Sequence, residues 1–215
     1  MANGSLIKVE LEKYNALHNR KAYGLETARK KWFTLPSDSK FIRKAIKILS
    51  SSDTILDVAC GKGSFIDHFK ETLNSEIQGI DISNIAVDSR PDLSIDLGSI
   101  HRLPYSDNSY DCVYHLDGME HIPVTLQSKV LDEQFRVAKK FIIHSLSTNI
   151  DKRSDEYLKK ININTTSVHI NLKSFDEWKN FFRKKARENG WKIIEFDCVS
   201  FDTQVCIIMK NNTSK

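Results

Sequence analysis

The spacing of hydrophobic residues in the first fifty positions is that of helices with one buried face. Apolar side chains recur every three to four residues, first at Leu11, Tyr14 and Leu17 and again across residues 41–49. This period is typical of amphipathic helices, and a further helix is expected between these two. We therefore predict that residues 1–50 form an N-terminal helical extension that packs on the core.

After that point the pattern changes to short apolar runs, many of them rich in β-branched residues, which alternate with segments of helical spacing. Strand-like runs cover residues 55–59, 76–81, 93–97, 111–116, 141–144, 191–199 and 203–209. Strands that alternate with helices predict an α/β protein with a parallel sheet covered on both faces. The last two runs lie so close in sequence that they are expected to form a hairpin.

A polar stretch at residues 147–171 interrupts this alternation. It is rich in Asn, Ser, Thr and Asp, and long ordered segments of this kind are often functional. We predict a long loop or small insertion here, within a main domain that spans residues 51–215.

Composition narrows the class of protein. With 40% hydrophobic and 28% charged residues, the chain is typical of a globular protein. It contains no run of the roughly 20 apolar residues that span a bilayer, and its N-terminus lacks the basic and apolar regions of a signal peptide. We therefore expect a cytoplasmic protein without a membrane span. The four cysteines form no C-x-x-C pair and are expected to be free thiols.

The net charge of +4 is unevenly distributed along the chain. Residues 1–50 carry eleven basic and four acidic side chains, residues 51–150 carry eight and fifteen, and residues 151–215 carry thirteen and nine. An acidic centre between basic flanks suits a cationic ligand in the middle and an anionic one at the rim. Solvated helix faces are the alternative explanation.

The clearest chemical signal is a glycine-containing turn between a strand and a helix, followed by an acidic residue at the end of the next strand. Gly61 and Gly63 allow a ligand to approach the backbone closely. Asp81 is placed to accept hydrogen bonds from both hydroxyls of a ribose. This arrangement fits either a nicotinamide cofactor or S-adenosylmethionine.

Two details favour the second cofactor. The third glycine of the dinucleotide fingerprint is replaced by Ile66, and Asp57 stands just before the turn. A carboxylate there repels a pyrophosphate but attracts a sulfonium and an ammonium group. Asp57 is therefore expected to lie beside a cationic cofactor.

Four segments together resemble the class I S-adenosylmethionine-dependent methyltransferases. They are residues 56–63, 79–83, 98–111 and 119–122. The resemblance implies a Rossmann-like three-layer sandwich with a seven-stranded, mostly parallel sheet, an antiparallel last strand and additional N-terminal helices. It also implies S-adenosyl-L-methionine as the cofactor and S-adenosyl-L-homocysteine as its product.

The resemblance further implies that the cofactor lies at the carboxyl ends of the first four strands. The residues concerned are Ala59, Gly61 and Gly63 for the methionine part, Asp81 for the ribose, Ile82, Ser99 and Ile100 for the adenine, and the backbone near Leu116 for the amino group. Three places depart from the family pattern: Ala59 replaces a glycine, Ser99 replaces an acidic residue, and Ala138-Lys139-Lys140 replaces the Gly-Gly turn before the fifth strand. Asp96 is the alternative to Ser99.

A hydroxyl acceptor of a methyl group requires a base that removes its proton. Candidates near the ends of the fourth and fifth strands are His115, Asp117, Glu120, His121 and His144. We favour His121, because a histidine takes up a proton near neutral pH, although a structural role at a helix start is the alternative. Asp117 is expected to orient the cofactor or the acceptor, and His144 is a further catalytic candidate. The segment 147–171 is expected near the acceptor, where His169 either faces it or lies on the surface.

These predictions favour O-methylation of a small or glycan-like acceptor, including an anionic one. N-methylation of a small amine, an inactive methyltransferase-like binding subunit and a nicotinamide-dependent oxidoreductase are the alternatives. No short metal-binding motif is present, so no metal is expected. The Asn-Pro-Pro-Tyr and Asp-Pro-Pro-Tyr motifs of base methyltransferases are missing after the fourth strand, which argues against nucleic acid as a partner.

Overall fold

The computed structural model describes residues 2–19, 40–71, 73–148, 152–163, 169–199 and 204–213. The strands are β1 (Thr54–Val58), β2 (Glu76–Asp81), β3 (Ile95–Leu97), β4 (Tyr110–Leu116), β5 (Ala138–Ser147), β6 (Trp191–Val199) and β7 (Gln204–Asn211). The helices are α1 (Ala2–Asn19), α3 (Lys40–Ser50), α4 (Ser64–Phe69), α5 (Asn84–Asp88), α6 (Val124–Val137), α7 (Lys152–Lys160) and α8 (Phe175–Glu188), with a short 3-10 helix, η1 (Met119–His121). The third N-terminal helix expected from the sequence falls on residues outside the described ranges.

All seven strands join one sheet in the order β3-β2-β1-β4-β5-β7-β6. Strands β1 to β5 pair in parallel, whereas β7 runs antiparallel to both of its neighbours, β5 and β6. The predicted Rossmann-like sheet with an antiparallel last strand is therefore confirmed. The closing hairpin is formed by β6 and β7.

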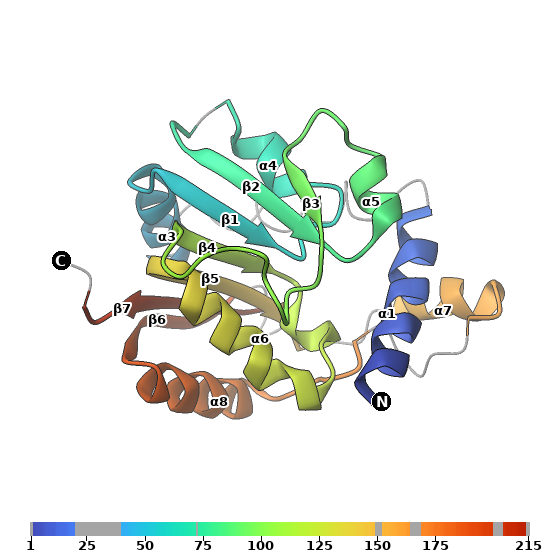
Figure 1. The fold of residues 1–215 in the computed structure, drawn as a ribbon. Coiled ribbons are helices and arrows are strands. Elements are labelled where there is room, and N and C mark those ends of the chain that lie inside the picture. Colours follow the sequence, from blue (N-terminus) through green and yellow to red (C-terminus); the bar gives the residue numbers. More distant parts are fainter. Residues whose placement is uncertain are drawn as a thin grey trace.

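Helices cover both faces of the sheet because adjacent residues of its central strands are apolar on both sides. In β4, Val113 packs into a cluster with Phe182 of α8. Its neighbour Tyr114 packs into the opposite cluster, where its ring stacks on that of Phe65 in α4 with centroids 4.0 Å apart. Helices α6 and α8 thus lie on one face and α3 and α4 on the other (Figure 1). The three-layer arrangement agrees with the prediction.

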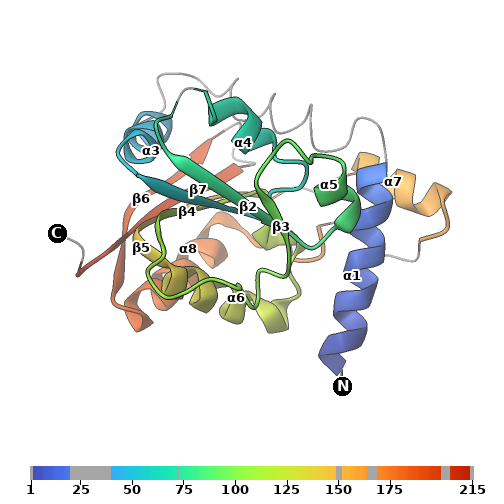
Figure 2. The same ribbon diagram turned by 45° about the horizontal axis from the view of Figure 1, so that its top comes forward.

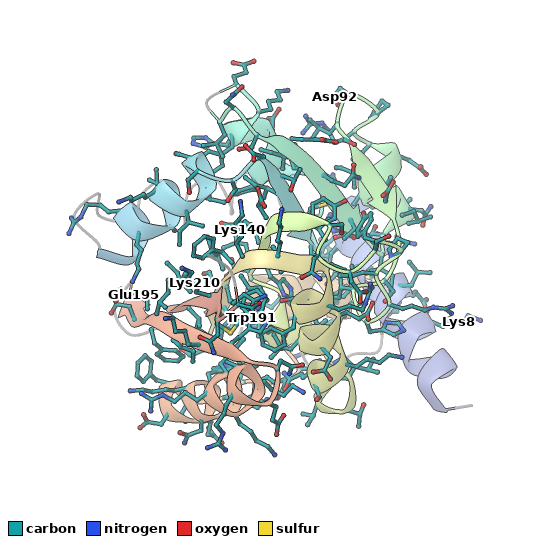
Figure 3. The ribbon with its side chains drawn as sticks, turned by 60° about the vertical axis from the view of Figure 1, so that its left-hand side comes forward. Lys8, Asp92, Lys140, Trp191, Glu195 and Lys210 are labelled. Atoms are coloured by element: carbon teal, nitrogen blue, oxygen red, sulfur yellow. The ribbon has the colours of Figure 1, made fainter. Side chains whose placement is uncertain are left out.

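Helix α1 stands at the edge of the sheet toward which the parallel strands run. It packs against α5 and α7, and Figure 2 shows it upright beside α5, close to the ends of β2 and β3. Figure 3 shows Lys140, at the start of β5, together with Lys210 at one end of the sheet, and Lys8 of α1 on the other side of the molecule. Any ligand at the carboxyl ends of the strands therefore lies near α1.

The N-terminal helix α3 is attached to the other end of the sheet. Lys44 donates hydrogen bonds to the carbonyl oxygen of Ile194 (2.7 Å) and to Glu195 (3.2 Å) in β6. The division of the chain into residues 1–50 and 51–215 stays a prediction. Among the described residues, no helix combines the length and apolar character needed to cross a membrane.

Several element boundaries differ from those expected from the pattern. Strand β5 begins at Ala138, directly after α6, because Ala138 already pairs with Tyr110 of β4. Strand β3 begins only at Ile95, because Leu93 lies in a turn whose backbone N–H donates to Arg90 (3.1 Å). Helix α7 occupies part of the polar stretch at residues 147–171, which is therefore not entirely a loop.

Candidate functional site

The turn between β1 and α4 has an unusual backbone. Ala59, Gly61 and Gly63 all have positive φ, at 55°, 55° and 69°. Glycine adopts this left-handed region without strain, whereas an L-residue such as alanine does not. Close packing adds a second reason for glycine at position 63, where a Cβ would lie 2.5 Å from a methyl carbon of Leu93.

Asp81 connects this turn to the end of β2. One carboxylate oxygen accepts the backbone N–H of Gly61, and the other accepts the backbone N–H of Ser83, both at 2.8 Å. Ser83 in turn caps α5, since its hydroxyl accepts the N–H of Ala86. Asp81, which is predicted to bind the ribose, is therefore held beside the turn that is predicted to bind the methionine part of the cofactor.

A second buried carboxylate, Asp57, lies close enough to Asp81 for the two charges to interact. Burial raises the pKa of Asp57 well above its ordinary value, and the charge of Asp81 raises it further. Burial also raises the pKa of Asp81, although the N–H groups of Ser83 and Gly61 oppose this effect. A cation bound here would favour the ionised form of both groups, so the site has the electrostatics of a cation-binding site.

The residues predicted to hold the adenine lie at the neighbouring strand ends. The backbone N–H of Gly98, after β3, donates to the carbonyl oxygen of Asp81 (2.8 Å). This bond brings half-buried Ile82 and Ser99 to the same edge of the sheet, with Ile100 buried behind them. The hydroxyl of Ser99 contacts the ring of His101. The alternative residue, Asp96, is exposed and accepts the Tyr105 hydroxyl (2.8 Å).

The chain reverses sharply after β4. Asp117 has a φ of 46°, and its backbone N–H donates to the carbonyl oxygen of Ser145 in β5 at 2.7 Å. Gly118 follows, and a Cβ at this position would lie 1.8 Å from Nε2 of His115. Half-buried Leu116 and Asp117 thus lie at the carboxyl edge, and any side chain at position 118 would collide with the His115 ring.

His121, the favoured base, lies in η1 next to residues from two distant segments. Its ring meets Tyr14 of α1 edge-on with centroids 5.8 Å apart and His169 at 4.7 Å. Its neighbour Glu120 is buried, and one carboxylate oxygen accepts the backbone N–H of Ser147 (2.7 Å). Polar groups from α1, η1 and the stretch before α8 therefore meet at this point.

His144 and His115 occupy a different environment. Both are fully buried, their rings are 5.1 Å apart, and His144 also lies 4.9 Å from Phe182. Burial lowers the pKa of His115 to about 3, and burial together with His115 lowers that of His144 well below 6.5. Because the His144 side chain is fully buried, it cannot reach an acceptor that enters from solvent, and its predicted catalytic role is not supported by its position.

Helix α1 supplies contacts that the sequence pattern did not identify. The amide of Asn15 donates to Asn84 (2.9 Å) and accepts the hydroxyl of Ser83 (2.7 Å). Buried His18 lies against the turn, because a Cβ on Gly61 would be 3.1 Å from its ring. Burial, aided by the charge of Lys62, lowers the pKa of His18 to about 4. The sequence offered one signal for these contacts: Asn15 and His18 are polar residues next to the apolar positions Tyr14 and Leu17 of the predicted helix.

Comparison with known sequences gives a consistent match to methyltransferases. The family model for a methyltransferase domain matches residues 55–140. The demethylmenaquinone methyltransferase of Shouchella clausii is 30% identical over 102 residues, covering 42% of this chain and 43% of that protein. The enzyme of the same name from Oceanobacillus iheyensis is also 30% identical, over 42% of this chain and 42% of that protein. The match thus covers about two fifths of the length of these curated relatives.

Solved structures show the same fold at lower identity. The magnesium protoporphyrin IX methyltransferase of Synechocystis PCC 6803, solved with bound S-adenosylhomocysteine, is 19% identical with a TM-score of 0.57, covering 79% of this chain and 78% of that one. A SAM-dependent methyltransferase of Aquifex aeolicus is 13% identical with a TM-score of 0.60, covering 87% and 94%. At such identities the likeness concerns the fold alone.

Proposed function

We propose that this chain is a class I, Rossmann-like methyltransferase, since the methyltransferase-domain model matches residues 55–140, and that it transfers a methyl group from S-adenosyl-L-methionine to a small acceptor. The observation that carries the proposal is the pair of buried carboxylates, Asp57 and Asp81, beside the left-handed turn. A ligand with a sulfonium and an ammonium group offsets this negative charge, whereas a pyrophosphate adds to it.

We assign each part of the cofactor to residues at the carboxyl edge of the sheet. Asp81 already accepts one N–H on each oxygen, and its remaining lone pairs suit the two ribose hydroxyls. The turn at Ala59, Gly61 and Gly63 is assigned to the methionine part. We assign the adenine to Ile82, Ser99 and Ile100, and the amino group to the backbone at Leu116.

For the acceptor we propose a hydroxyl group on a small or glycan-like molecule. When bound, the cofactor supplies a methyl group that the acceptor oxygen attacks in line with the carbon–sulfur bond. His121 is assigned as the group that takes the hydroxyl proton, because it is half-buried beside Tyr14 and His169. Asp117 at the end of β4 orients the acceptor. An anionic acceptor is favoured by the excess of basic residues in the two segments that flank the centre of the chain, residues 1–50 and 151–215.

The test is a methyl-transfer assay with isotopically labelled S-adenosylmethionine and three acceptor classes: hydroxylated carbohydrates, neutral and phosphorylated; small amines; and a demethylmenaquinol, which the name of the curated relatives suggests. We expect product on a carbohydrate hydroxyl. Replacing His121→Ala should lower kcat about 100-fold or more and remove the ascending limb of the pH profile, with exposed His68→Ala as the control.

The other outcomes are equally definite. Product on an amine would replace O-methylation with N-methylation, and product on the quinol would assign the acceptor class named for the relatives. Unchanged turnover and pH profile in His121→Ala would show that His121 is not the base. Cofactor binding without transfer to any acceptor would favour the inactive binding subunit.

A further inference from the structure

Glu120, His121 and His169 bring one carboxylate and two imidazoles together at the acceptor end of the site. One potential ligand atom from each residue lies within 4.8 Å of the others. Glu120 is buried and both histidines are half-buried. Two histidines and one carboxylate are a common donor set for divalent transition metals. We propose that these three residues form a binding site for a divalent first-row transition-metal ion.

The position of His169 is fixed by hydrogen bonds rather than by chance proximity. Asn171, two residues further along, donates its backbone N–H to the carbonyl oxygen of Glu120 (3.0 Å) and its side-chain amide to that of Ile122 (3.2 Å). Lys173 holds the amide oxygen of Asn171 at 2.7 Å. These bonds attach the stretch before α8 to both sides of His121, so His169 is held against it.

The carboxylate is oriented in the same way. One oxygen of Glu120 accepts the N–H of Ser147 at 2.7 Å, and such outer hydrogen bonds are what orients ligating carboxylates in metal sites. Bonds of about 2.0–2.2 Å from a metal to nitrogen and oxygen place ligand atoms roughly 3–4 Å apart. The observed 4.8 Å limit therefore requires only a small closure of side chains around an ion.

This site deepens the proposed function and rests on it for its role in the reaction. A bound ion would coordinate the acceptor oxygen and make its proton easier to lose to solvent, and the oxygen lone pair would then form the new bond to the methyl carbon as the carbon–sulfur bond breaks. His121 would serve as a ligand in the metal-loaded protein and as the base in the metal-free protein. An acceptor with two neighbouring oxygen donors would gain most, because it can chelate the ion.

The test is a titration of the metal-free protein with Co²⁺, followed by visible absorption, and by competition with Zn²⁺. We expect bands of nitrogen-coordinated Co²⁺ in the wild-type protein, with an apparent affinity at least tenfold weaker in His169→Ala. Replacing exposed His68→Ala should leave the titration unchanged, which controls for surface histidines. Asn171→Ala should weaken binding by a smaller factor, because it only releases the clamp on His169.

Absence of these bands in the wild-type protein, or equal Co²⁺ affinity in wild type and His169→Ala, would overturn the metal site. Titration of the same preparations with S-adenosylhomocysteine separates this result from the proposed function. Preserved binding of that ligand shows that His169→Ala is folded and leaves the methyltransferase assignment intact. Failure of the wild-type protein to bind S-adenosylhomocysteine would instead overturn the methyltransferase assignment, whatever the Co²⁺ result.

Discussion

Ala59 illustrates how a single residue carries backbone strain in the turn after β1. Its φ of 55° lies in the left-handed region, which costs an L-residue about 1–2 kcal/mol relative to its preferred conformations. Glycine would adopt the same conformation without that cost, which gives a physical reason for the glycine that the family pattern has here. The methyl group of Ala59 packs against the main core cluster, which offsets part of the strain.

We predict that Ala59→Gly stabilises the protein by about 1 kcal/mol, because the relief of strain exceeds the small loss of packing and the greater freedom of glycine in the unfolded chain. Urea denaturation measures this directly. The matched control is Ala86→Gly, since Ala86 is buried in helix α5, where glycine should destabilise by about 1 kcal/mol or more. A loss of stability in both variants would contradict the account of the turn.

The sequence was sufficient to place the residues assigned to the cofactor at one edge of the sheet, whereas the contacts around His121 could be predicted only in part. Gly61, Gly63 and Asp81 follow strands at characteristic positions, and strand order in a parallel α/β sheet brings such positions to one edge. Their arrangement in space agrees with that expectation. The contact between His121 and His169 depends on how the stretch before α8 folds back, and local periodicity carries no information about that path. The expectation that no metal binds stays untested, and our proposal departs from it.

At the scale of elements, the position of α1 beside the site is the main feature that the hydrophobic pattern did not predict. The pattern predicted an amphipathic helix around Leu11, Tyr14 and Leu17, and the structure contains it in α1. Hydrophobic periodicity shows that a helix has a buried face, but it does not show which other element packs against that face. The strands were predicted more completely, because their alternation with helices restricts the topology.

Asn15 attaches α1 to the site, since its side chain forms hydrogen bonds with Ser83 and Asn84, just after Asp81. Replacing Asn15→Ala should weaken S-adenosylhomocysteine binding about 3- to 10-fold, because two hydrogen bonds of about 1 kcal/mol each hold the loop in place. Calorimetric titration measures the change. Glu12→Ala, on the exposed side of the same helix, is the control and should bind normally. Equal affinity in both variants would show that α1 does not support the site.

At the scale of the whole molecule, buried histidines determine how stability responds to acid. The pKa is lowered to about 4 for His18 and about 3 for His115, and it is also lowered for His144. The unfolded chain takes up protons at these positions from about pH 6.5 downward, whereas the folded protein does not. These histidines therefore lower the free energy of unfolding as the pH falls below 6.5.

We predict a loss of about 2 kcal/mol for each of these histidines between pH 7.5 and pH 5. Urea unfolding at the two pH values gives the difference. Replacing His144→Leu, among the apolar side chains around Phe182, should reduce the loss by the contribution of one histidine. If His144→Leu lost as much stability as the wild type between pH 7.5 and pH 5, a buried, neutral His144 would be disproved.

Asp57 and Asp81 act in the opposite direction. Their raised pKa values mean that their protonated forms stabilise the folded protein, and this stabilisation is lost as the pH rises through the folded pKa values. A cationic ligand reverses this effect, because it favours the ionised carboxylates. The two acidic groups therefore connect the stability of the molecule to the occupancy of its central site.

The most direct test of the methyltransferase assignment is calorimetric titration of the full chain with S-adenosylhomocysteine, S-adenosylmethionine and NAD. We predict that both adenosyl ligands bind and NAD does not. Asp81→Asn should weaken their binding at least tenfold, because an amide replaces a charged acceptor of ribose hydrogen bonds, whereas exposed Asp88→Asn should leave it unchanged. Failure of both adenosyl ligands to bind, or equal affinity in wild type and Asp81→Asn, would contradict the assignment of this site.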